Sequence, residues 1–517
     1  LLAPNQAYLL TPGAFLRIPV EALVVAGLAL VLPSAARRVM AGVVGVLIGL
    51  VVIGKVLDIA FFVGLDRPFN LVTDRSYFSP MRWLVRDAIG PVAGDLVLAA
   101  AIVLAIGMLV LMPLALGRLT SLLARHRRRS VGIVAALTAL WVIGVMADLR
   151  VPAGEPLASA GAGRFAVDEV RAVSAAVRSQ EKFEEATSVD PYADAAAGDL
   201  LAGLRGKDVV IAFVESYGRT AVDGSSPRVE AVLDGGTRRL HASGYATRSG
   251  FLTSPTLGGL SWLAHSTLQT GLWVSDQGRY DRLLSSNRMS LTALFGRDGW
   301  RTVAVMPASR EDWPEGERFY RLDQIHDRRS IEYHGPKFGF ARMPDQYALE
   351  ALQRQELAKR DRAPVMAMVE LASSHAPWAP LPEIIDWESL GDGSVFEDIH
   401  ERARSATELW NDSDDVEAAY DEAVAYSLEA LISFAEEYGD DDLVLVVVGD
   451  HQPATVVSGH GASRDVPITF IAHDRTVVDR IAGWGWQDGM KPDPDAPVWP
   501  MDDFRDRFLD AFGTDPP

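Results

Sequence analysis

The pair Asp450-His451 places two metal-ligand side chains directly after a run of strong β-formers. Residues 443–448 read LVLVVV and are followed by Gly449. This run predicts a buried strand whose end delivers a carboxylate and an imidazole to one edge of a sheet. In open α/β sheets, binding and active sites lie at the edge formed by the carboxyl ends of the strands. The alternative is an ordinary strand end with Asp450 capping a helix, so the ends of the other strands are needed to decide.

Carboxylate or imidazole groups also follow two other predicted strands. We predict strands over residues 208–214, 302–305, 365–369, 443–448 and 468–471. Glu215 follows the first, whereas Glu370 and then Ser374-His375 follow the third. Any one of these ends could be a surface turn. Three together indicate a convergent site at the carboxyl edge of the sheet.

Helical stretches separate these strands, and the alternation predicts the fold class. Residues 345–357 and 415–438 are two such stretches. Alternating strand and helix is typical of an α/β domain with a mostly parallel sheet and helices on both faces.

Ser261 is a candidate nucleophile within the segment 253–271 (TSPTLGGLSWLAHSTLQTG). Gly258 and Gly259 permit a tight approach of the backbone, and Ser261 then opens a predicted helix through Thr270. A hydroxyl at a helix N-terminus, beside a divalent metal, is well placed to ionise. The alternative is that Ser261 only caps the helix.

Four apolar stretches in the first 150 residues are predicted membrane spans, at residues 19–32, 39–63, 91–116 and 130–146. Most of them are long enough to cross a bilayer. The first is short and contains Glu21, which makes it the weakest of the four. Their lengths and flanking arginines favour spans over buried globular helices, and their number excludes a cleaved signal peptide.

Positive charge orients these spans. Arginines lie between the first and second spans and between the third and fourth, so both loops should be cytoplasmic. They are Arg37, Arg38, Arg118, Arg125, Arg127, Arg128 and Arg129. Everything after Arg150 then lies outside the cell membrane. The chain begins at Leu1 without a methionine, and we expect a missing N-terminal segment, another span being one form of it.

Charge divides the chain at the same place. The first 150 residues contain 14 Lys and Arg against 7 Asp and Glu, whereas the other 367 contain 35 against 61. An acidic surface of this kind argues against a nucleic-acid partner. The chain has no cysteine, so disulfides, thiol nucleophiles and thiolate metal sites are excluded.

We therefore predict three regions. Residues 1–149 form a multi-pass transmembrane region of about four helices, and residues 150–206 form a juxtamembrane linker and helix. Residues 207–517 form an extracellular catalytic domain.

Taken in order, these motifs resemble the sulfatase-like branch of the alkaline phosphatase superfamily. They are Glu215 after a strand, Ser261 with Thr270-Gly271 behind it, Ser374-His375-Ala376-Pro377, and Gly449-Asp450-His451. With the membrane spans, the chain is most similar to membrane-anchored enzymes of the lipoteichoic acid synthase type. The resemblance covers about two-thirds of the chain and implies an alkaline phosphatase-like fold.

The resemblance also implies roles for individual residues. The resemblance implies that one divalent metal is bound by four residues, Glu215, Ser261, Asp450 and His451. It also implies that Ser261 is the nucleophile. Oxygen-rich ligands favour Mn²⁺ or Mg²⁺, with Zn²⁺ as the alternative. By the same resemblance His375 contacts the substrate phosphate or acts as an acid. His460 resembles a second histidine near the site in phosphoethanolamine transferases, where it would contact the metal ligands or bind a second metal. Both histidines could instead be ordinary surface residues.

Three departures narrow the resemblance. Ser261 lacks the Pro and Arg that follow the modified residue of formylglycine sulfatases, so an unmodified phosphoseryl enzyme is expected. Leu371 replaces an Asp that two-metal phosphatases require, so one metal is expected. The segment 306–313 lacks a histidine that the synthase type uses to hold its head group. We name Arg310 and Arg318 as candidate substrate-binding residues in its place. Trp378 is a further candidate because it neighbours a motif, with core packing as the alternative.

The leading hypothesis is a membrane-anchored, metal-dependent phosphotransferase or phosphodiesterase. Its substrate would be a membrane lipid or a lipid-linked or cell-envelope phosphodiester, with glycerophosphate or a similar head group. Tethering favours a lipid donor because it raises the effective concentration at the bilayer.

Alternatives from other classes stay open. The chain could be a catalytically silent sensor or scaffold for an envelope polymer, or a phosphoethanolamine transferase-like enzyme. A transporter is disfavoured because the spans hold few ionisable residues, namely Glu21, Lys55, Asp58 and Asp95. The sequence does not identify protein partners.

Overall fold

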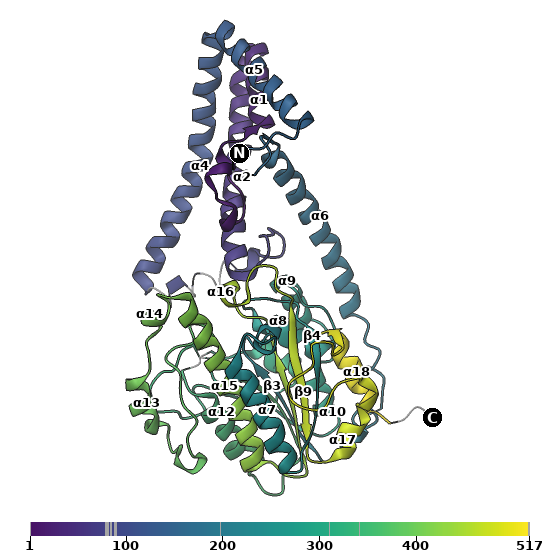
Figure 1. Cartoon of the computed structure of the whole chain (residues 1–517). Helices are drawn as coiled ribbons and strands as arrows, with labels where there is room; N and C mark the ends of the chain where they lie inside the picture. The colour runs from purple at the N-terminus through teal and green to yellow at the C-terminus, as the bar shows by residue number, and fades with distance from the viewer. Residues whose placement is uncertain are drawn as a thin grey trace. The chain divides into compact units, whose positions relative to one another are not determined.

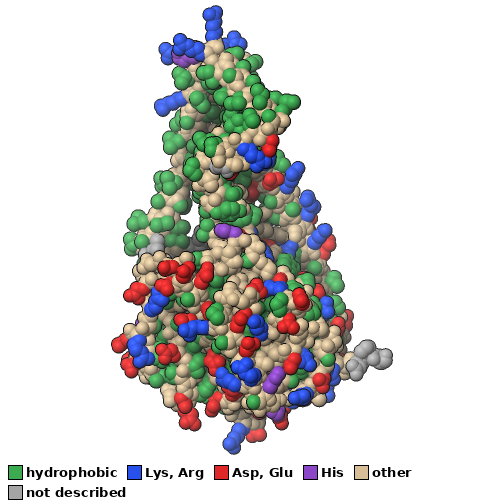
Figure 2. Space-filling view, in the orientation of Figure 1, with side chains coloured by type: hydrophobic (Ala, Val, Ile, Leu, Met, Phe, Trp, Pro, Cys, Tyr) green, Lys and Arg blue, Asp and Glu red, His purple; other side chains and the backbone are tan. Residues whose placement is uncertain are grey.

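The computed structural model describes residues 2–77, 82, 85–86, 90–152, 154–196, 198–309, 311–340 and 342–514. The chain forms two compact units, Leu1–Glu181 and Lys182–Pro517. Hydrophobic side chains cover much of the first unit, whereas charged side chains are spread over the second (Figure 2). The three predicted regions stay a prediction, since this division does not separate the linker.

The first unit consists mainly of apolar helices. They are α1 (Val20–Val31), α2 (Ser34–Leu65), α4 (Pro91–Arg125) and α5 (Arg127–Met146). Helix α6 (Gly161–Thr187), which carries many charged residues, follows them in the chain and continues into the second unit. Strands β1 (Ile18–Pro19) and β2 (Ala158–Ser159) pair in parallel beside them. Among the described residues, α2, α4 and α5 are long and apolar enough to cross a membrane. Helix α1 has only 12 residues, so the number of spans stays a prediction.

Small residues allow α2 and α4 to approach closely. A Cβ added to Gly45 of α2 would collide with the backbone of Pro113 in α4, and one added to Gly49 would press on Leu109. Close contact of this kind replaces the hydrophobic effect as the force that joins helices in a lipid environment.

The second unit is built on an eight-stranded sheet in the order β10-β4-β9-β8-β3-β7-β5-β6 (Figure 1). The strands are β3 (Asp208–Val214), β4 (Ala246–Thr253), β5 (Arg301–Met306), β6 (Gln324–Asp327), β7 (Val365–Leu371), β8 (Leu443–Gly449), β9 (Asp465–Ala472) and β10 (Val498–Pro500). All neighbours pair in parallel except β9, which runs antiparallel to β4 and β8. The predicted mostly parallel sheet is confirmed.

Helices cover both faces of this sheet, as predicted. The helices that follow α6 in the chain are α7 (Pro227–Ala242), α8 (Ser261–Thr270), α9 (Gln277–Leu284), α10 (Leu291–Arg297), α11 (Pro314–Tyr320), α12 (Asp345–Leu352), α13 (Glu397–Arg402), α14 (Ala406–Leu409), α15 (Ser413–Tyr438), α16 (Thr455–Ser458), α17 (Arg475–Arg480) and α18 (Asp503–Phe512). The alternating side chains of β3 divide the core between the two faces. Val210 and Ala212 pack with α7, α12 and α15, whereas Val209 and Ile211 pack with α8, α10 and α18.

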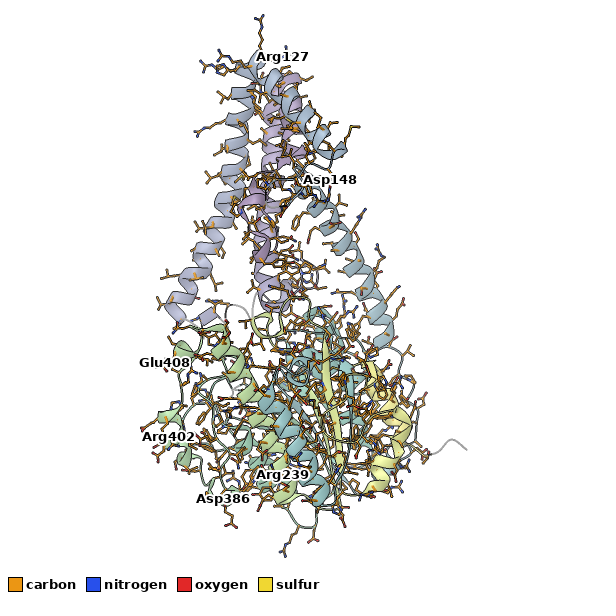
Figure 3. The ribbon with its side chains drawn as sticks, in the orientation of Figure 1. Arg127, Asp148, Arg239, Asp386, Arg402 and Glu408 are labelled. Atoms are coloured by element: carbon orange, nitrogen blue, oxygen red, sulfur yellow. The ribbon has the colours of Figure 1, made fainter. Side chains whose placement is uncertain are left out.

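Helices α7 and α15 are joined by charge as well as by apolar packing. Arg239 of α7, labelled in Figure 3, donates to Glu429 and to Glu436 of α15. Both helices pack on the face of the sheet that carries Val210. They therefore brace the strands that lead to the candidate site.

The fold predicts that Gly449 tolerates no side chain. A Cβ at this position would collide with the Tyr217 carbonyl oxygen, which is backbone and cannot rotate away. We expect Gly449→Ala to destabilise the second unit by about 1–3 kcal/mol, the usual cost of overpacking, measured by thermal unfolding in detergent. Gly483→Ala is the control because its Cβ meets open space. Equal melting temperatures for the two variants would contradict this explanation.

Candidate active site

Parallel pairing of β3 with β8 brings the first two candidate ligands together. Val214 is paired with Gly449, so the next residues, Glu215 and Asp450, leave the sheet side by side. All seven residues of each strand are buried, so neither strand can slip without exposing its apolar side chains. The register of two apolar strands thus places two carboxylates at one point.

Backbone donors hold the Asp450 carboxylate in place. Its Oδ1 accepts from the Ser216 N–H at 2.8 Å and from the His451 N–H at 2.7 Å. Ser216 has φ of 57°, in the left-handed region, and the Tyr420 hydroxyl donates to its carbonyl at 2.9 Å. These contacts leave Asp450 Oδ2 directed toward the rest of the site.

The His451 ring is fixed with one nitrogen toward the carboxylates. Its Nδ1 lies 2.8 Å from the Gln452 carbonyl, which can only accept, so Nδ1 carries a proton. Nε2 then faces Glu215 Oε1 at 3.2 Å and Asp450 Oδ2 at 3.8 Å. A buried imidazole oriented by a carbonyl in this way is the usual arrangement of a histidine that binds metal through Nε2.

Ser261 completes the cluster from the opposite side. Its Oγ donates to Glu215 Oε2 at 2.8 Å and lies 3.2 Å from His451 Nε2. Helix α8 begins at Ser261, as predicted, but the N-cap residue is Leu260, with φ of 67° and no capping side chain. The capping alternative for Ser261 is therefore wrong, because its hydroxyl contacts the two candidate ligands instead.

Burial and mutual charge shift the acid-base behaviour of all three ionisable groups. Burial, and after it the charge of Glu215, raises the pKa of Asp450 to about 7. Burial alone would lower the pKa of His451, but Asp450 and Glu215 overcome it and raise this pKa to about 9. Burial likewise opposes ionisation of Glu215, yet His451 and then His375 hold its pKa well below the ordinary value.

The donor set fits a divalent metal ion. Ligand atoms of Glu215, Asp450 and His451 all lie within 4.8 Å of one another. Two carboxylates this close and this deeply buried repel each other, and a cation between them removes that conflict. The serine hydroxyl would supply a fourth ligand, giving the mostly oxygen set that suits Mn²⁺, Mg²⁺ or Zn²⁺.

A hydrogen-bonded turn after β7 supports the site from the next strand. The Ser374 hydroxyl donates to the Glu215 carbonyl at 2.6 Å. Ser373 and the buried Asp345 exchange hydrogen bonds of 3.0 Å through backbone N–H groups, and Ser427 donates to the same carboxylate at 2.6 Å. Burial raises the pKa of Asp345 to about 6.

His375 follows this turn and is half-buried. Its ring stacks on Phe340 with the ring centres 3.9 Å apart and an angle of 11°. Nδ1 lies 2.5 Å from the Ala376 carbonyl, so Nδ1 carries the proton and Nε2 is left to face a substrate. The preceding residue, Ser374, bonds to the Glu215 carbonyl, so His375 lies next to a residue that contacts the cluster.

His265 is a site residue that the sequence analysis missed. It lies one helical turn after Ser261 on α8 and is 8% exposed, packed on the ring of Phe213 at 4.0 Å. Nδ1 is 3.6 Å from Glu370 Oε1, and Nε2 is 3.9 Å from Asp450 Oδ2. Nε2 has no hydrogen-bond partner in the described part of the chain. The i,i+4 spacing from Ser261 is the signal that could have identified it.

The remaining predicted residues lie outside this cluster. His460 is exposed in the turn after α16, and Arg318 is exposed on α11. Arg310 lies outside the described residues. Trp378 is 2% exposed and donates from Nε1 to the Ser374 carbonyl at 2.8 Å.

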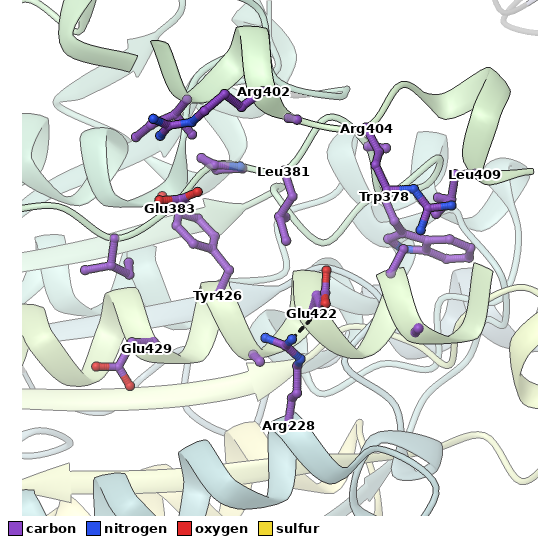
Figure 4. A pocket seen from close by; sticks show the side chains of 18 of the residues that line it. Arg228, Trp378, Leu381, Glu383, Arg402, Arg404, Leu409, Glu422, Tyr426 and Glu429 are labelled. Carbon is purple, nitrogen blue, oxygen red and sulfur yellow. Dashed lines mark ion pairs between the residues drawn. The ribbon is translucent and has the colours of Figure 1, made fainter. Parts of the chain in front are cut away.

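Trp378 forms part of the wall of a cavity of about 720 Å³ between α15, α7 and the chain that follows β7 (Figure 4). Apolar side chains such as Leu381 line it, and Arg228 pairs with Glu422 at 3.1 Å on its wall. The cavity is linked to the site because Trp378 bonds to Ser374, which in turn bonds to Glu215.

Comparison with known proteins finds similar structures at low identity. The lipoteichoic acid synthase LtaP from Listeria monocytogenes matches with 16% identity over 65% of this chain and 80% of that one, with a TM-score of 0.38. The Streptococcus pyogenes phosphoglycerol transferase GacH, in complex with sn-glycerol-1-phosphate, matches with 12% identity over 65% and 91%, with a TM-score of 0.37. The periplasmic domain of EptC from Escherichia coli matches with 13% identity over 60% and 82%, with a TM-score of 0.37.

No protein-family model and no curated protein sequence matches the chain. The resemblance to the sulfatase-like branch of the alkaline phosphatase superfamily therefore rests on the sequence motifs. With identities of 12–16% and TM-scores below 0.5, no property is transferred from these structures, and the chemistry follows from this chain's own residues.

The pKa values predict pH-dependent metal binding. A metal must displace protons from Asp450, with a pKa of about 7, and from His451, with a pKa of about 9. We expect Mn²⁺ or Zn²⁺ to bind more tightly as pH rises from about 6 to about 9, by up to roughly tenfold per pH unit for each displaced proton. Isothermal titration calorimetry in two buffers measures both affinity and proton release. Affinity that does not change over this range would contradict the proposed ligands.

Proposed function

We propose that the chain is a membrane-anchored, metal-dependent phosphotransferase or phosphodiesterase that works through a phosphoseryl adduct at Ser261. The observation that carries this proposal is the position of the Ser261 hydroxyl, which contacts both Glu215 Oε2 and His451 Nε2. A serine that only supported the fold would have no reason to point into a pair of buried carboxylates.

In the first step the Ser261 oxygen attacks phosphorus in a phosphodiester. The Oγ–P bond forms, and the bond from phosphorus to the leaving alcohol breaks. Glu215 cannot keep the serine proton because its pKa is held far below the ordinary value, so this proton passes to solvent. When bound, a divalent ion would lower the pKa of the serine hydroxyl and offset charge on the phosphoryl oxygens.

His375 is placed to handle the second proton. Nε2 is directed away from the carbonyl that holds Nδ1, and when it carries a proton as well, it can donate that proton to the leaving alkoxide. In the second step the oxygen of an alcohol or water bonds to phosphorus, the Oγ–P bond breaks, and His375, now neutral, accepts the proton of that nucleophile at Nε2. The Ser261 oxygen leaves as an alkoxide and takes a proton from solvent, which returns the serine to its starting state. An alcohol acceptor makes the enzyme a transferase, and water makes it a hydrolase.

The three long apolar helices supply the membrane anchor. Arg127 begins α5, and Asp148 follows the other end of this helix; both are labelled in Figure 3. Arginines at the α4–α5 connection favour a cytoplasmic location for it, and the catalytic unit then follows the outer end of α5. A lipid-linked phosphodiester or a cell-envelope polymer is the substrate class that this location favours.

Removing the nucleophile tests the mechanism. We expect Ser261→Ala to lower metal-dependent release of nitrophenol from a nitrophenyl phosphodiester by at least roughly 10³-fold. Ser261→Thr retains the hydroxyl and should keep measurable activity. Ser225→Ala, an exposed serine outside the site, is the matched control. Undiminished activity of the alanine variant would rule out Ser261 as the nucleophile.

His265 is expected to position Asp450. We predict that His265→Gln weakens metal affinity about tenfold, as is typical for groups that orient metal ligands, with kcat following metal occupancy. Titration of metal against activity separates this effect from simple loss of folded protein. His241→Gln serves as the control, because His241 lies on α7 and contacts Thr247. If the metal affinities of the His265→Gln and His241→Gln variants are equal, His265 does not position Asp450.

A further inference from the structure

A second polar cavity, of about 430 Å³, lies within the membrane unit. It is bounded by the last turns of α2, the first turns of α6 and residues 2–9 of the chain. Its volume falls within the range of sites that bind small ligands. Nothing in the proposed chemistry at Ser261 uses it.

Two buried ionisable residues of α2 form part of its wall. Lys55 is 6% exposed and Asp58 is 2% exposed, although α2 is otherwise strongly apolar. Lys55 donates to the Ala3 carbonyl at 2.6 Å and lies over the Phe165 ring at 5.7 Å. Asp58 accepts from the Asn5 side chain at 2.7 Å. These contacts hold the rim of the cavity in place while both charges remain in its lining.

Helix α6 contributes one continuous face to the same cavity. Besides Gly161, its first residue, the lining residues of this helix have the spacing i, i+1, i+4, i+5 and i+8, which is a single helical stripe. They are Arg164, Phe165, Asp168, Glu169 and Ala172. Arg164 and Asp168 are exposed, so both can reach a ligand.

The lining carries both signs of charge. Arg17 and Glu155 pair with each other at 2.7 Å. The other ionisable residues are two cations, Lys55 and Arg164, and three carboxylates, Asp58, Asp168 and Glu169, of which the exposed Asp168 also pairs with Arg171 at 3.6 Å. A uniformly cationic lining would suit a polyanion, but cations facing carboxylates suit a ligand that holds a phosphate beside an amine.

The depth of the cavity matches the outer head-group layer. Arg37 and Arg38 mark the cytoplasmic end of α2. Lys55 follows Arg38 by 17 residues, which is about 26 Å along a helix. A hydrocarbon core is about 30 Å thick, so Lys55 lies close to the opposite boundary. Ionisable residues at this depth in a span commonly mark a functional site.

We propose that this cavity binds a zwitterionic lipid head group of the outer leaflet, a phosphate next to a primary amine. Lys55 and Arg164 would attract the phosphate, whereas Asp168 and Glu169 would attract the ammonium group. Phe62 and Phe165 would contact the glycerol and the first methylenes. The inference goes beyond the proposed function and stands on the membrane unit alone.

Lipid retention measured by native mass spectrometry tests this proposal. The full chain carrying Ser261→Ala is purified in an uncharged maltoside and titrated separately with phosphatidylethanolamine, phosphatidylglycerol and diacylglycerol. The inactive background separates binding from turnover, so failure of the catalytic proposal leaves this test intact. We expect phosphatidylethanolamine to be retained roughly tenfold more tightly than the other two. Equal retention of all three lipids would overturn the proposal.

Exposed residues provide variants that should fold. Arg164→Gln and Asp168→Asn are each expected to lower retention of phosphatidylethanolamine by roughly tenfold. Their matched controls, Arg118→Gln and Asp95→Asn, alter exposed charges of α4 outside the cavity and should retain it fully. Unchanged retention in both cavity variants contradicts the site. Soluble phosphoethanolamine at the same concentration should not displace the lipid, and displacement would contradict a membrane source for the ligand.

Discussion

The parallel register between β3 and β8 is the constraint on which the site depends. Both strands are buried along their whole length, so apolar packing fixes their alignment to the residue. That alignment places Glu215 and Asp450 next to each other where the strands end. The hydrophobic core therefore creates an electrostatic conflict between two carboxylates that water cannot screen. The neighbouring imidazole of His451 relieves part of it, and a divalent cation would relieve the rest.

The surrounding polar groups keep this arrangement rigid. Backbone N–H groups occupy one oxygen of Asp450, the Gln452 carbonyl fixes the His451 ring, and Ser374 holds the Glu215 backbone. Each bond comes from a different strand end or turn, so the ligands cannot move independently. A preorganised site of this kind costs little reorganisation when charge develops on a phosphoryl group. The same edge of the sheet receives Ser261 from α8, where a residue in the left-handed region precedes the helix.

Much of the second unit could be predicted because its central strands are apolar runs that are followed by carboxylate and imidazole side chains. Glu215 and Asp450 were found in this way, and all five predicted strands are present. Strand β4 was missed because ATRSGFLT has polar residues and a glycine inside it, and its burial depends on neighbours distant in sequence. Strands β6 and β10 were missed because they are short. The antiparallel direction of β9 has no local signal, since direction is decided by tertiary pairing. His265 was missed because the site was predicted from residues that follow strands, whereas His265 lies one turn inside a helix.

The stereochemical course at phosphorus tests the central claim most directly. A phosphodiester made chiral at phosphorus with oxygen isotopes, or as a phosphorothioate, would be transferred to an alcohol acceptor and the product configuration determined. Two successive in-line displacements, first by Ser261 and then by the acceptor, each invert the configuration, so the account predicts overall retention. Overall inversion would mean that the acceptor attacks the substrate directly, and it would contradict a phosphoseryl intermediate.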